Sequence, residues 1–501
     1  MTETPNGFKE TTTKDLSKFF KLERTIHDLS AKPVIGIGIA AVFLSVIWLA
    51  THALTAGIEN QAFIVAAGVI GGYMALNIGA NDVANNVGPA FGAKSLTMLG
   101  ALVIAAIFET SGALIAGGDV VKTISKGIID PALIPDPKIF LMLMMSALLA
   151  AALWINFATV VNAPVSTTHS IVGGVLGAGV AAAGLSVVNW AVMGKIAASW
   201  VISPVLGGVI AALFLAFIKK KVLYQKDTIS AAKKWVPILV ALMAGVFAAY
   251  LSVKGLKKLW KPEPWMVAAI GAGFFAITYA IVKPVIAKRA DGMENTKKTI
   301  RNMFHLPLIC AAALLSFAHG ANDVANAVGP LAAIVAIAST GAATAKVGIP
   351  PWVMFVGAAG ITMGLLLFGP KLIRTVGTKI TRMNPMRAYC VALSAAITVI
   401  VASGLGLPVS STHIAVGAVF GIGFFREFHG SRGDHMGGYE KKASERPPSK
   451  WDLLPSAEKA RRKKLVRRQY LWTIIAAWVI TVPLSAMLSS VIFFALKGAF
   501  G

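Results

Sequence analysis

Long apolar stretches, separated by short polar segments, run along the whole chain. Several approach or exceed the roughly 20 residues that a helix needs to cross a bilayer. They are Pro33 to Leu54, Phe140 to Val160, Val187 to Ile218, Met266 to Val285 and Leu471 to Leu496. The alternating segments of about ten residues that are typical of a transmembrane barrel are absent from the sequence. The pattern predicts an all-α, polytopic membrane protein with about 10–12 spans plus an extra N-terminal helix.

The composition and the placement of charge support this class. Of the 501 residues, 56% are hydrophobic and 14% are charged, whereas a soluble domain carries about 25% charged residues. The net charge of +25 could suit nucleic-acid binding, but basic residues cluster between the apolar stretches, from Lys219, Lys288 and Lys459. Positive loops beside membrane helices mark the cytoplasmic side. We therefore expect a multi-pass protein of the cell (inner) membrane that contacts lipid and binds no nucleic acid.

The N-terminus and the cysteines add little chemistry. Residues 1–33 are polar and charged, and no secretory signal precedes the first apolar stretch. We expect this segment in the cytoplasm, followed by the extra transmembrane helix at 34–56. Cys310 and Cys390 lie in apolar sequence without the spacing of a metal site or a disulfide framework. They are predicted to be small core residues.

Internal repeats divide the rest of the chain. The segment "GANDVANNVGPA" at 79–90 returns as "GANDVANAVGPL" at 320–331, with ten of twelve positions identical. A second pair, "PVSTTHS" at 164–170 and "PVSSTHI" at 408–414, follows in the same order. A weaker third pair begins at Ala198 and at Ala476. We predict two homologous transport repeats, at 60–218 and 303–498.

Two segments lie outside this repeat pattern. Residues 219–302 hold basic loops around two apolar stretches, 235–253 and 265–285, which predict a helical hairpin. Residues 426–469 form a polar, basic insert in the second repeat, expected as a cytoplasmic loop. Repeats that are direct in sequence need not be parallel in space, and halves of inverted topology are common in transporters.

The first motif places polar residues where a membrane helix should continue. Gly79 permits unwinding, and Pro89 lacks a backbone donor and disfavours helix at Gly88. We expect a broken helix whose unwound carbonyls attract a cation. The side-chain oxygens that could bind a hard cation or a proton are those of Asn81, Asp82, Asn85, Asn322, Asp323 and Asn326. The alternative is that these side chains only cap or bridge helices, but two near-identical copies favour a function.

The second motif is typical of a helix start. Pro164 suits a first helical turn, and the hydroxyls that follow would lie at a helix N-terminus, which attracts anions. The hydroxyl residues are Ser166, Thr167, Thr168, Ser410, Ser411 and Thr412. Two such helix starts that face each other near the midplane could enclose one oxyanion. The alternative is ordinary N-capping by Ser and Thr. The pairing with the aspartate motifs favours the anion site.

Four further ionisable residues lie in apolar sequence. Glu109 is expected to be paired or protonated and to take part in ion coupling. His169 and His413 follow the hydroxyls, where a proton relay and a structural hydrogen bond are both open. His319 precedes the second motif, but Ile78 stands at that place in the first, which argues against a shared essential role.

The duplicated "GANDVAN" motif, each copy followed by a Pro-Val-Ser-Ser/Thr-Thr-His element, resembles the inorganic phosphate transporter family. That family includes sodium- or proton-coupled phosphate permeases and a related bacterial sulfate permease. The resemblance implies an inverted-repeat helical fold with broken helices, re-entrant segments and a central oxyanion site. It also implies that the aspartate motifs serve cations and substrate and that the hydroxyls hold the anion. A segment that contains Glu in many members has Ala392 here.

Together these features predict secondary active transport of inorganic phosphate, coupled to Na⁺ or H⁺. No nucleotide-binding or hydrolase motif is present in the sequence, so we expect no enzyme, no ATP-driven pump and no cofactor besides the transported ions. A sodium ion would be held at Asp82, Asn85, Asp323 and Asn326. A sulfate permease of the same architecture and an anion channel are the alternatives. The sequence allows a homodimer without requiring one.

Overall fold

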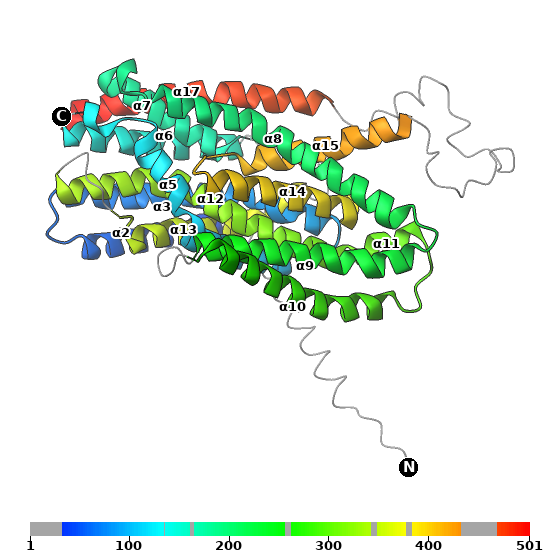
Figure 1. The fold of residues 1–501 in the computed structure, drawn as a ribbon. Helices are drawn as coiled ribbons and strands as arrows, with labels where there is room; N and C mark the ends of the chain where they lie inside the picture. The colour runs from blue at the N-terminus through cyan, green and yellow to red at the C-terminus, as the bar shows by residue number, and fades with distance from the viewer. Residues whose placement is uncertain are drawn as a thin grey trace, which may run out of the picture.

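The fold is described by a computed structural model that covers residues 33–134, 136–160, 165–255, 262–341, 348–376, 383–431 and 468–500. These residues form helices and their connections. Within this part of the chain the only strand-like pairing is an isolated bridge between Ile129 and Val188. The prediction of an all-α protein is therefore confirmed, and Figure 1 shows the long helices lying side by side in one bundle.

The first half of the chain contains the predicted extra helix and the first repeat. Its helices are α2 (Pro33–Leu54), α3 (Gln61–Gly92), α4 (Met98–Ala116), α5 (Gly118–Lys122), the π-helical turn η1 (Thr123–Gly127), the 3₁₀ turn η2 (Pro131–Leu133), α6 (Pro137–Val160), α7 (Thr167–Ala183), the 3₁₀ turn η3 (Leu185–Val187) and α8 (Trp190–Ile218). The π-helical turn η4 (Lys219–Leu223) then leads out of the repeat.

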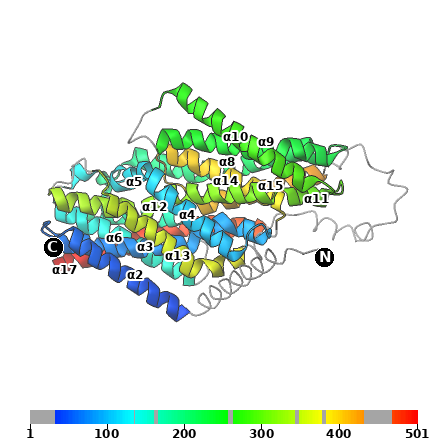
Figure 2. The ribbon, with the colours of Figure 1, turned by 90° about the horizontal axis from the view of Figure 1, so that it is seen from below.

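The second half begins with the predicted hairpin, which is helical. The helices of this half of the chain are α9 (Thr228–Lys254), α10 (Pro264–Ala290), α11 (Lys297–Met303), α12 (His305–Thr340), α13 (Pro351–Thr375), α14 (Pro385–Gly404), α15 (Ser411–Ser431) and α17 (Arg468–Phe500). Of these, α9 and α10 form the hairpin. In Figure 2 the pair α9 and α10 lies along one edge of the bundle, and α2 lies along the opposite edge.

The chain is a multi-pass membrane protein. Eleven helices within the described residues are long and apolar enough to cross a membrane, α2 among them. Apolar side chains such as Phe274, Ile277 and Ile281 on α10 point outward and are exposed, as is expected where lipid replaces water. By contrast, α12 is buried along most of its length. The polar motifs therefore lie inside the bundle.

The predicted break at the first motif is wrong. Helix α3 runs through Gly79, Gly88 and Pro89 without interruption, and α12 passes Pro330 in the same way. The glycine serves close packing instead of unwinding. A Cβ on Gly79 would lie 1.9 Å from the carbonyl oxygen of Ile361 in α13. Small residues allow such close approach of membrane helices, and neighbouring helices support a helix that contains proline.

The chain breaks instead between α6 and α7 and between α14 and α15. Helix α7 begins at Thr167 and α15 begins at Ser411, and both starts are buried. In Figure 1 the two helices leave the centre toward opposite ends of the molecule. The predicted broken, re-entrant segments therefore lie at the hydroxyl motifs.

Helices of each repeat pack against helices of the other repeat. Helix α3 packs on α13 and α12 packs on α4, while α17 packs on α7 and α15 packs on α8. A Cβ on Gly320 would lie 2.1 Å from the carbonyl oxygen of Glu109, which matches the contact of Gly79 with Ile361. Counterpart residues therefore occupy equivalent positions in the two halves, as a two-fold relation between the repeats requires.

Counterpart helices α3 and α12 run in opposite directions. Ser95, just after α3, contacts His305 at the start of α12, with 2.6 Å between Oγ and Nδ1. At the other end, Gly71 in the first half of α3 lies against Leu331 in the second half of α12. Antiparallel counterparts are what inverted repeats require. The topology relative to a membrane stays a prediction.

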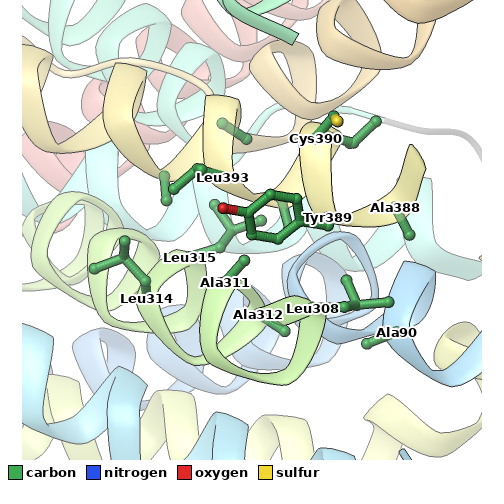
Figure 3. Close-up of a cluster of buried hydrophobic side chains, with 14 of the residues drawn as sticks. Ala90, Leu308, Ala311, Ala312, Leu314, Leu315, Ala388, Tyr389, Cys390 and Leu393 are labelled. Atoms are coloured by element: carbon green, nitrogen blue, oxygen red, sulfur yellow. The ribbon is translucent and has the colours of Figure 1, made fainter. Parts of the chain in front are cut away.

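The core between the helices is apolar and closely packed. Figure 3 shows Tyr389 of α14 lying among Ala311, Leu314 and Leu315 of α12, and all four side chains are buried. Cys390 is buried beside Tyr389, and Cys310 is half-buried. Both cysteines are free thiols, which agrees with their predicted role as packing residues.

Several predictions concern residues that the structure does not describe. Of the segment 1–33, which is predicted to be cytoplasmic, residues 1–32 lie outside the described residues, as does Pro164. The insert 426–469 lies outside them from 432 to 467. Helix α15 continues to Ser431 and α17 begins at Arg468, so both ends of the predicted insert belong to helices. The division into repeats at 60–218 and 303–498 stays a prediction.

Candidate functional site

The first aspartate motif lies in the C-terminal half of α3 and the second in the middle of α12, and these two helices pack against each other. Asp82 and Asp323 are buried, each with 1% of its surface exposed. A buried carboxylate needs partners because transfer of a charge from water is costly. The structure supplies these partners from the two hydroxyl helices, α7 and α15.

Asp82 accepts hydrogen bonds from hydroxyl groups of both repeats. Thr167 Oγ1 of α7 donates to Asp82 Oδ2 at 3.0 Å, and Thr412 Oγ1 of α15 donates to Oδ1 at 2.9 Å. The two helix starts also contact each other, because Thr168 Oγ1 donates to the carbonyl oxygen of Val409 at 3.0 Å. The predicted meeting of two hydroxyl-bearing helix starts is thus seen beside one carboxylate.

Asp323 has different surroundings from Asp82. Its hydroxyl contact, from Ser411 Oγ to Oδ2, is long at 3.4 Å. Its closest ionisable partner is His319, one turn earlier in α12, with 3.0 Å between Nε2 and Oδ2. The same histidine nitrogen lies 3.9 Å from Asp82 Oδ2. The two aspartates are therefore equivalent in sequence but not in chemistry.

The asparagines tie the motifs to the hydroxyl helices. Asn85 donates to Thr412 Oγ1 at 2.9 Å, and Asn326 lies within 3.3 Å of the hydroxyls of both Thr167 and Thr168. These bonds join each aspartate motif to the hydroxyl helix of the other repeat. The amide oxygen of Asn326 is buried and accepts no hydrogen bond from the described residues. It is an acceptor available to a bound cation.

Asn81 and Asn322 hold the backbone just before the hydroxyl helices. Asn81 donates to Asp82 and to the carbonyl oxygen of Val165, the latter at 3.3 Å. Asn322 donates to Asp323 and to the carbonyl oxygen of Val409, the latter at 2.6 Å. These amides orient the carboxylate and the start of the next helix together. They stand within the motif helices, so the helix-capping alternative does not apply to them.

Ser166 and Ser410 act as N-caps. Ser166 Oγ accepts from the backbone N–H of His169 at 3.2 Å, and Ser410 Oγ accepts from that of His413 at 3.3 Å. Ser166 also contacts the ring of His169, with 2.8 Å between Oγ and Nδ1. These two hydroxyls are therefore occupied by local structure, as the capping alternative predicts. The threonines are better placed to meet a ligand.

Glu109 lies beside the site in a small polar cluster. It is fully buried in α4 and accepts from Asn86 at 2.8 Å. His319 is also fully buried, with 3.3 Å between its Nδ1 and Glu109 Oε1. The imidazole thus has a carboxylate at each ring nitrogen. Neither nitrogen makes an aligned hydrogen bond to the described residues, so His319 lies at ion-pair distance from both carboxylates without bridging them by hydrogen bonds.

From the sequence, His319 is not expected to have a shared essential role, and Asn86 is not among the predicted site residues. The signal was present in the comparison of the two repeats. Their motifs differ at Asn86, where the second copy has Ala327, and His319 corresponds to Ile78. In the structure, both differences surround Glu109. The positions at which the two repeats differ therefore identify a second set of polar residues. A difference between the repeats does not show that a residue lacks a function.

The counterpart of Glu109 is Ile361 and not Ala392. Gly320 packs on the carbonyl of Glu109 as Gly79 packs on that of Ile361. The next residue in each helix, Thr110 and Thr362, shares a hydrogen bond of 2.6 Å with the other, as counterparts beside a two-fold axis can. Ala392 is buried in the apolar core between α12 and α14. The acidic residue is therefore matched by an isoleucine in the other repeat.

The buried carboxylates and His319 could hold a cation. Ligand atoms of Asp82, His319 and Asp323 all lie within 4.8 Å of one another. Carboxylate and carbonyl oxygens suit a hard cation such as Na⁺. The hydroxyls of Thr167 and Thr412 donate to the same Asp82 carboxylate, so cation ligands and anion donors adjoin the same side chain.

The site can now be compared with known proteins. A family model described as "Phosphate transporter family" matches residues 78–489. The chain belongs to the phosphate transporter family. It is 44% identical to a Helicobacter pylori J99 protein named "Putative phosphate permease", over 96% of this chain and 98% of that protein. A similarly named protein of Pyrococcus furiosus is 36% identical over 86% of this chain and 96% of its own length.

The fold is similar to that of a solved member of the same kind. A structure described as "The sodium-dependent phosphate transporter" superposes with a TM-score of 0.76 at 35% identity, covering 87% of this chain and 99% of that chain. The resemblance predicted from the two duplicated motifs is thus confirmed. Members of the phosphate transporter family are transporters, so the buried polar site at the crossing of the two repeats is the natural candidate for the transport site.

Proposed function

We propose that this protein carries inorganic phosphate across the cell (inner) membrane by secondary active transport, together with Na⁺. One observation carries the proposal. A single buried carboxylate, Asp82, accepts hydrogen bonds from threonines at the starts of both hydroxyl helices. Those hydroxyls and helix N-termini are donors of the kind that bind an oxyanion.

The proposed coupling follows from the number of donors. Thr167 and Thr412 have one O–H each, and both O–H groups are directed at Asp82. A cation bound to the oxygens of Asp82 would neutralise the carboxylate and free these donors for phosphate. The anion would then bind well only after the cation. Such mutual dependence of two ligands is a coupling free energy, and it acts equally in both directions.

Sodium is the coupling ion that we favour. The solved structure with 35% identity is described as sodium-dependent, and the oxygen atoms of Asp82, Asp323 and Asn326 suit a hard cation. A proton is the second candidate, because His319 lies between Asp323 and Glu109 at distances that suit an imidazolium. Transport with H⁺ would use this histidine and its carboxylates as the proton carrier.

Sulfate transport and an anion channel are the remaining alternatives. Phosphate changes its protonation near neutral pH, by analogy with phosphate esters whose second pKa is about 6, whereas sulfate does not. A carboxylate that can accept a proton from the anion therefore favours phosphate. A channel would need no cation ligands beside the anion donors, and anion flux would follow the anion gradient alone.

Uptake of radiolabelled phosphate into proteoliposomes tests these proposals. An inward Na⁺ gradient should drive accumulation above equilibrium, and a K⁺ gradient of the same size is the matched control. An imposed pH gradient tests whether H⁺ is the coupling ion. Competition by unlabelled sulfate tests which anion is transported. Accumulation driven by the pH gradient alone would show that the coupling ion is H⁺ and not Na⁺. Flux that ignores both gradients would refute symport, and sulfate flux without phosphate flux would refute the substrate.

A further inference from the structure

The connection between α14 and α15 is held from several sides. It runs from Gly404 to Ser410 and delivers the second hydroxyl helix to the site. Its backbone carbonyls are bonded by side chains of other elements. Lys254 Nζ of α9 donates to Gly404 O at 2.8 Å, and Thr123 Oγ1 of η1 donates to Gly406 O at 2.6 Å. The hairpin outside the repeats therefore contacts the segment that positions the site.

A third carbonyl of this connection, that of Pro408, is bonded by Trp200. The indole Nε1 of this α8 residue donates to Pro408 O at 3.0 Å. The indole ring also stacks on the imidazole of His169, with ring centroids 3.7 Å apart and planes inclined by 26°. His169 belongs to the first hydroxyl helix, and Pro408 belongs to the connection before the second. One side chain thus touches both hydroxyl elements.

Both contacts of Trp200 lead directly to hydroxyl groups. His169 contacts the N-cap Ser166 through Nδ1, at 2.8 Å, and its ring meets that of His413 edge to face at 4.9 Å. Pro408 precedes Val409, whose carbonyl accepts from Thr168. A tilt of the indole would therefore move the two helix starts relative to each other. Such a shift changes the spacing of donors that an anion must bridge.

We propose that Trp200 is a positioning residue that holds the two hydroxyl-bearing helix starts at the spacing required by the anion. The inference rests on the proposed phosphate transport, but its structural part can be tested separately. Trp200 touches neither aspartate in the structure, so its effect should fall on anion affinity and not on the coupling ion.

The test compares Trp200→Phe with Trp190→Phe. Trp200→Phe keeps a ring against His169 and loses the donor to Pro408. Trp190 is a matched control on the same helix, since its indole also donates to a backbone carbonyl, that of Leu185 at 3.2 Å, away from the site. In proteoliposomes, Trp200→Phe should raise the KM for phosphate about five-fold, the effect of one hydrogen bond. The maximal rate and the Na⁺ dependence should stay near wild type, and Trp190→Phe should change none of them.

Hydrogen–deuterium exchange supplies a second readout that needs no transport. The backbone amides of residues 405–412 should exchange faster in Trp200→Phe than in wild type or Trp190→Phe, in detergent and without phosphate. Wild-type exchange in this segment would overturn the positioning role even if uptake were altered. An unchanged KM with active wild-type protein would overturn it as well. Absence of uptake by the wild-type chain would instead refute the proposed function.

Discussion

Asp82 and Asp323 occupy the same place in two copies of one motif, yet their partners differ. Asp82 accepts from two threonines, one from each repeat. Asp323 lies 3.0 Å from His319 and has only a long contact with Ser411. Removal of one carboxylate should therefore affect a different part of the transport cycle than removal of the other.

We predict separate defects for Asp82→Asn and Asp323→Asn. A hydrogen bond to a charged group contributes about 1.5–3 kcal/mol, or roughly a ten- to hundred-fold effect. Asp82→Asn should abolish gradient-driven uptake and change the residual binding of phosphate, because it alters the partners of both threonines. Asp323→Asn should weaken the response to the cation by a factor of this size. Phosphate binding and Na⁺ titrations of uptake measure the two effects.

Equal defects in the two variants would contradict the asymmetry that the structure shows. Glu59→Gln is a suitable control, because this acid lies in the connection between α2 and α3, away from the site. It should leave uptake unchanged. Loss of uptake in that control would point to general damage by removal of an acid.

The polar cluster of Glu109, Asn86 and His319 has an apolar equivalent within the same chain. The corresponding residues are Ile361, Ala327 and Ile78. Removal of one partner from a buried ion pair costs about 3–5 kcal/mol, whereas replacement of all partners by apolar residues can be neutral. Glu109→Ile alone should therefore lower the thermal unfolding midpoint markedly. The triple variant Glu109→Ile, Asn86→Ala, His319→Ile should recover part of that loss, because it also removes the His319 partner of Asp323.

Uptake should separate structure from function in this series. If the cluster serves coupling, the triple variant should fold and fail to accumulate phosphate. Gradient-driven accumulation at the wild-type level by a folded triple variant would assign the cluster to stability alone. A triple variant that is less stable than Glu109→Ile would show that the two halves do not tolerate the same residues at these places.

At the scale of single residues, much of the site was predictable from its duplicated motifs. All thirteen expected residues lie in or beside one buried region where α3, α4, α7, α12 and α15 meet. The sequence could not show that Asp82, and not Asp323, takes both threonines. That choice depends on where two helices from different repeats begin. The relative position of these two helix starts has no counterpart in local sequence.

At the scale of elements, the motif helices show why glycine was misread. Glycine in a membrane helix can mark unwinding or close packing, and the local sequence is the same in both cases. The contact that decides lies in another helix, at Ile361 for Gly79 and at Glu109 for Gly320. Hydrophobic pattern therefore predicted the helices well, but it could not predict the continuity of α3 and α12.

The packing role of these glycines predicts an unusual sign for alanine substitution. Glycine to alanine in a helix interior normally stabilises by about 0.5–1 kcal/mol. A Cβ at position 79 would lie 1.9 Å from a backbone oxygen, so α3 and α13 would have to separate. Gly79→Ala should lower the free energy of unfolding by about 1–3 kcal/mol, the usual cost of overpacking. The unfolding midpoint in detergent measures this change.

Gly194→Ala is the matched control for that substitution. Gly194 lies in α8, and nothing lies within 4 Å of the place where its Cβ would be. This variant should be as stable as wild type or slightly more stable. A Gly79→Ala variant with the same midpoint as Gly194→Ala would refute the packing argument and reopen the possibility that the motif helix unwinds.

At the scale of the molecule, the antiparallel contact of α3 with α12 connects sequence repeats to transport. Two inverted halves can present the same site first to one side of a membrane and then to the other by exchange of their conformations. Here α7 and α15 start at the site and run to opposite ends. Each motif helix carries one aspartate and donates amides to the hydroxyl helix of the other half.

The inverted arrangement predicts the side from which each motif helix can be labelled. The basic segments at 219–235 and 286–302 are expected in the cytoplasm. Since α12 begins near these segments and α3 ends beside its first residue, the end of α3 should be cytoplasmic and the end of α12 external. Single cysteines at Lys94 and Thr340, both exposed, should then react with a membrane-impermeant maleimide from opposite sides, in a chain whose Cys310 and Cys390 are replaced by alanine. If the cysteines at positions 94 and 340 are both labelled from the same side of intact cells, the inverted topology is refuted. The proposed transport would then lose its basis, because it depends on two inverted halves that exchange conformations.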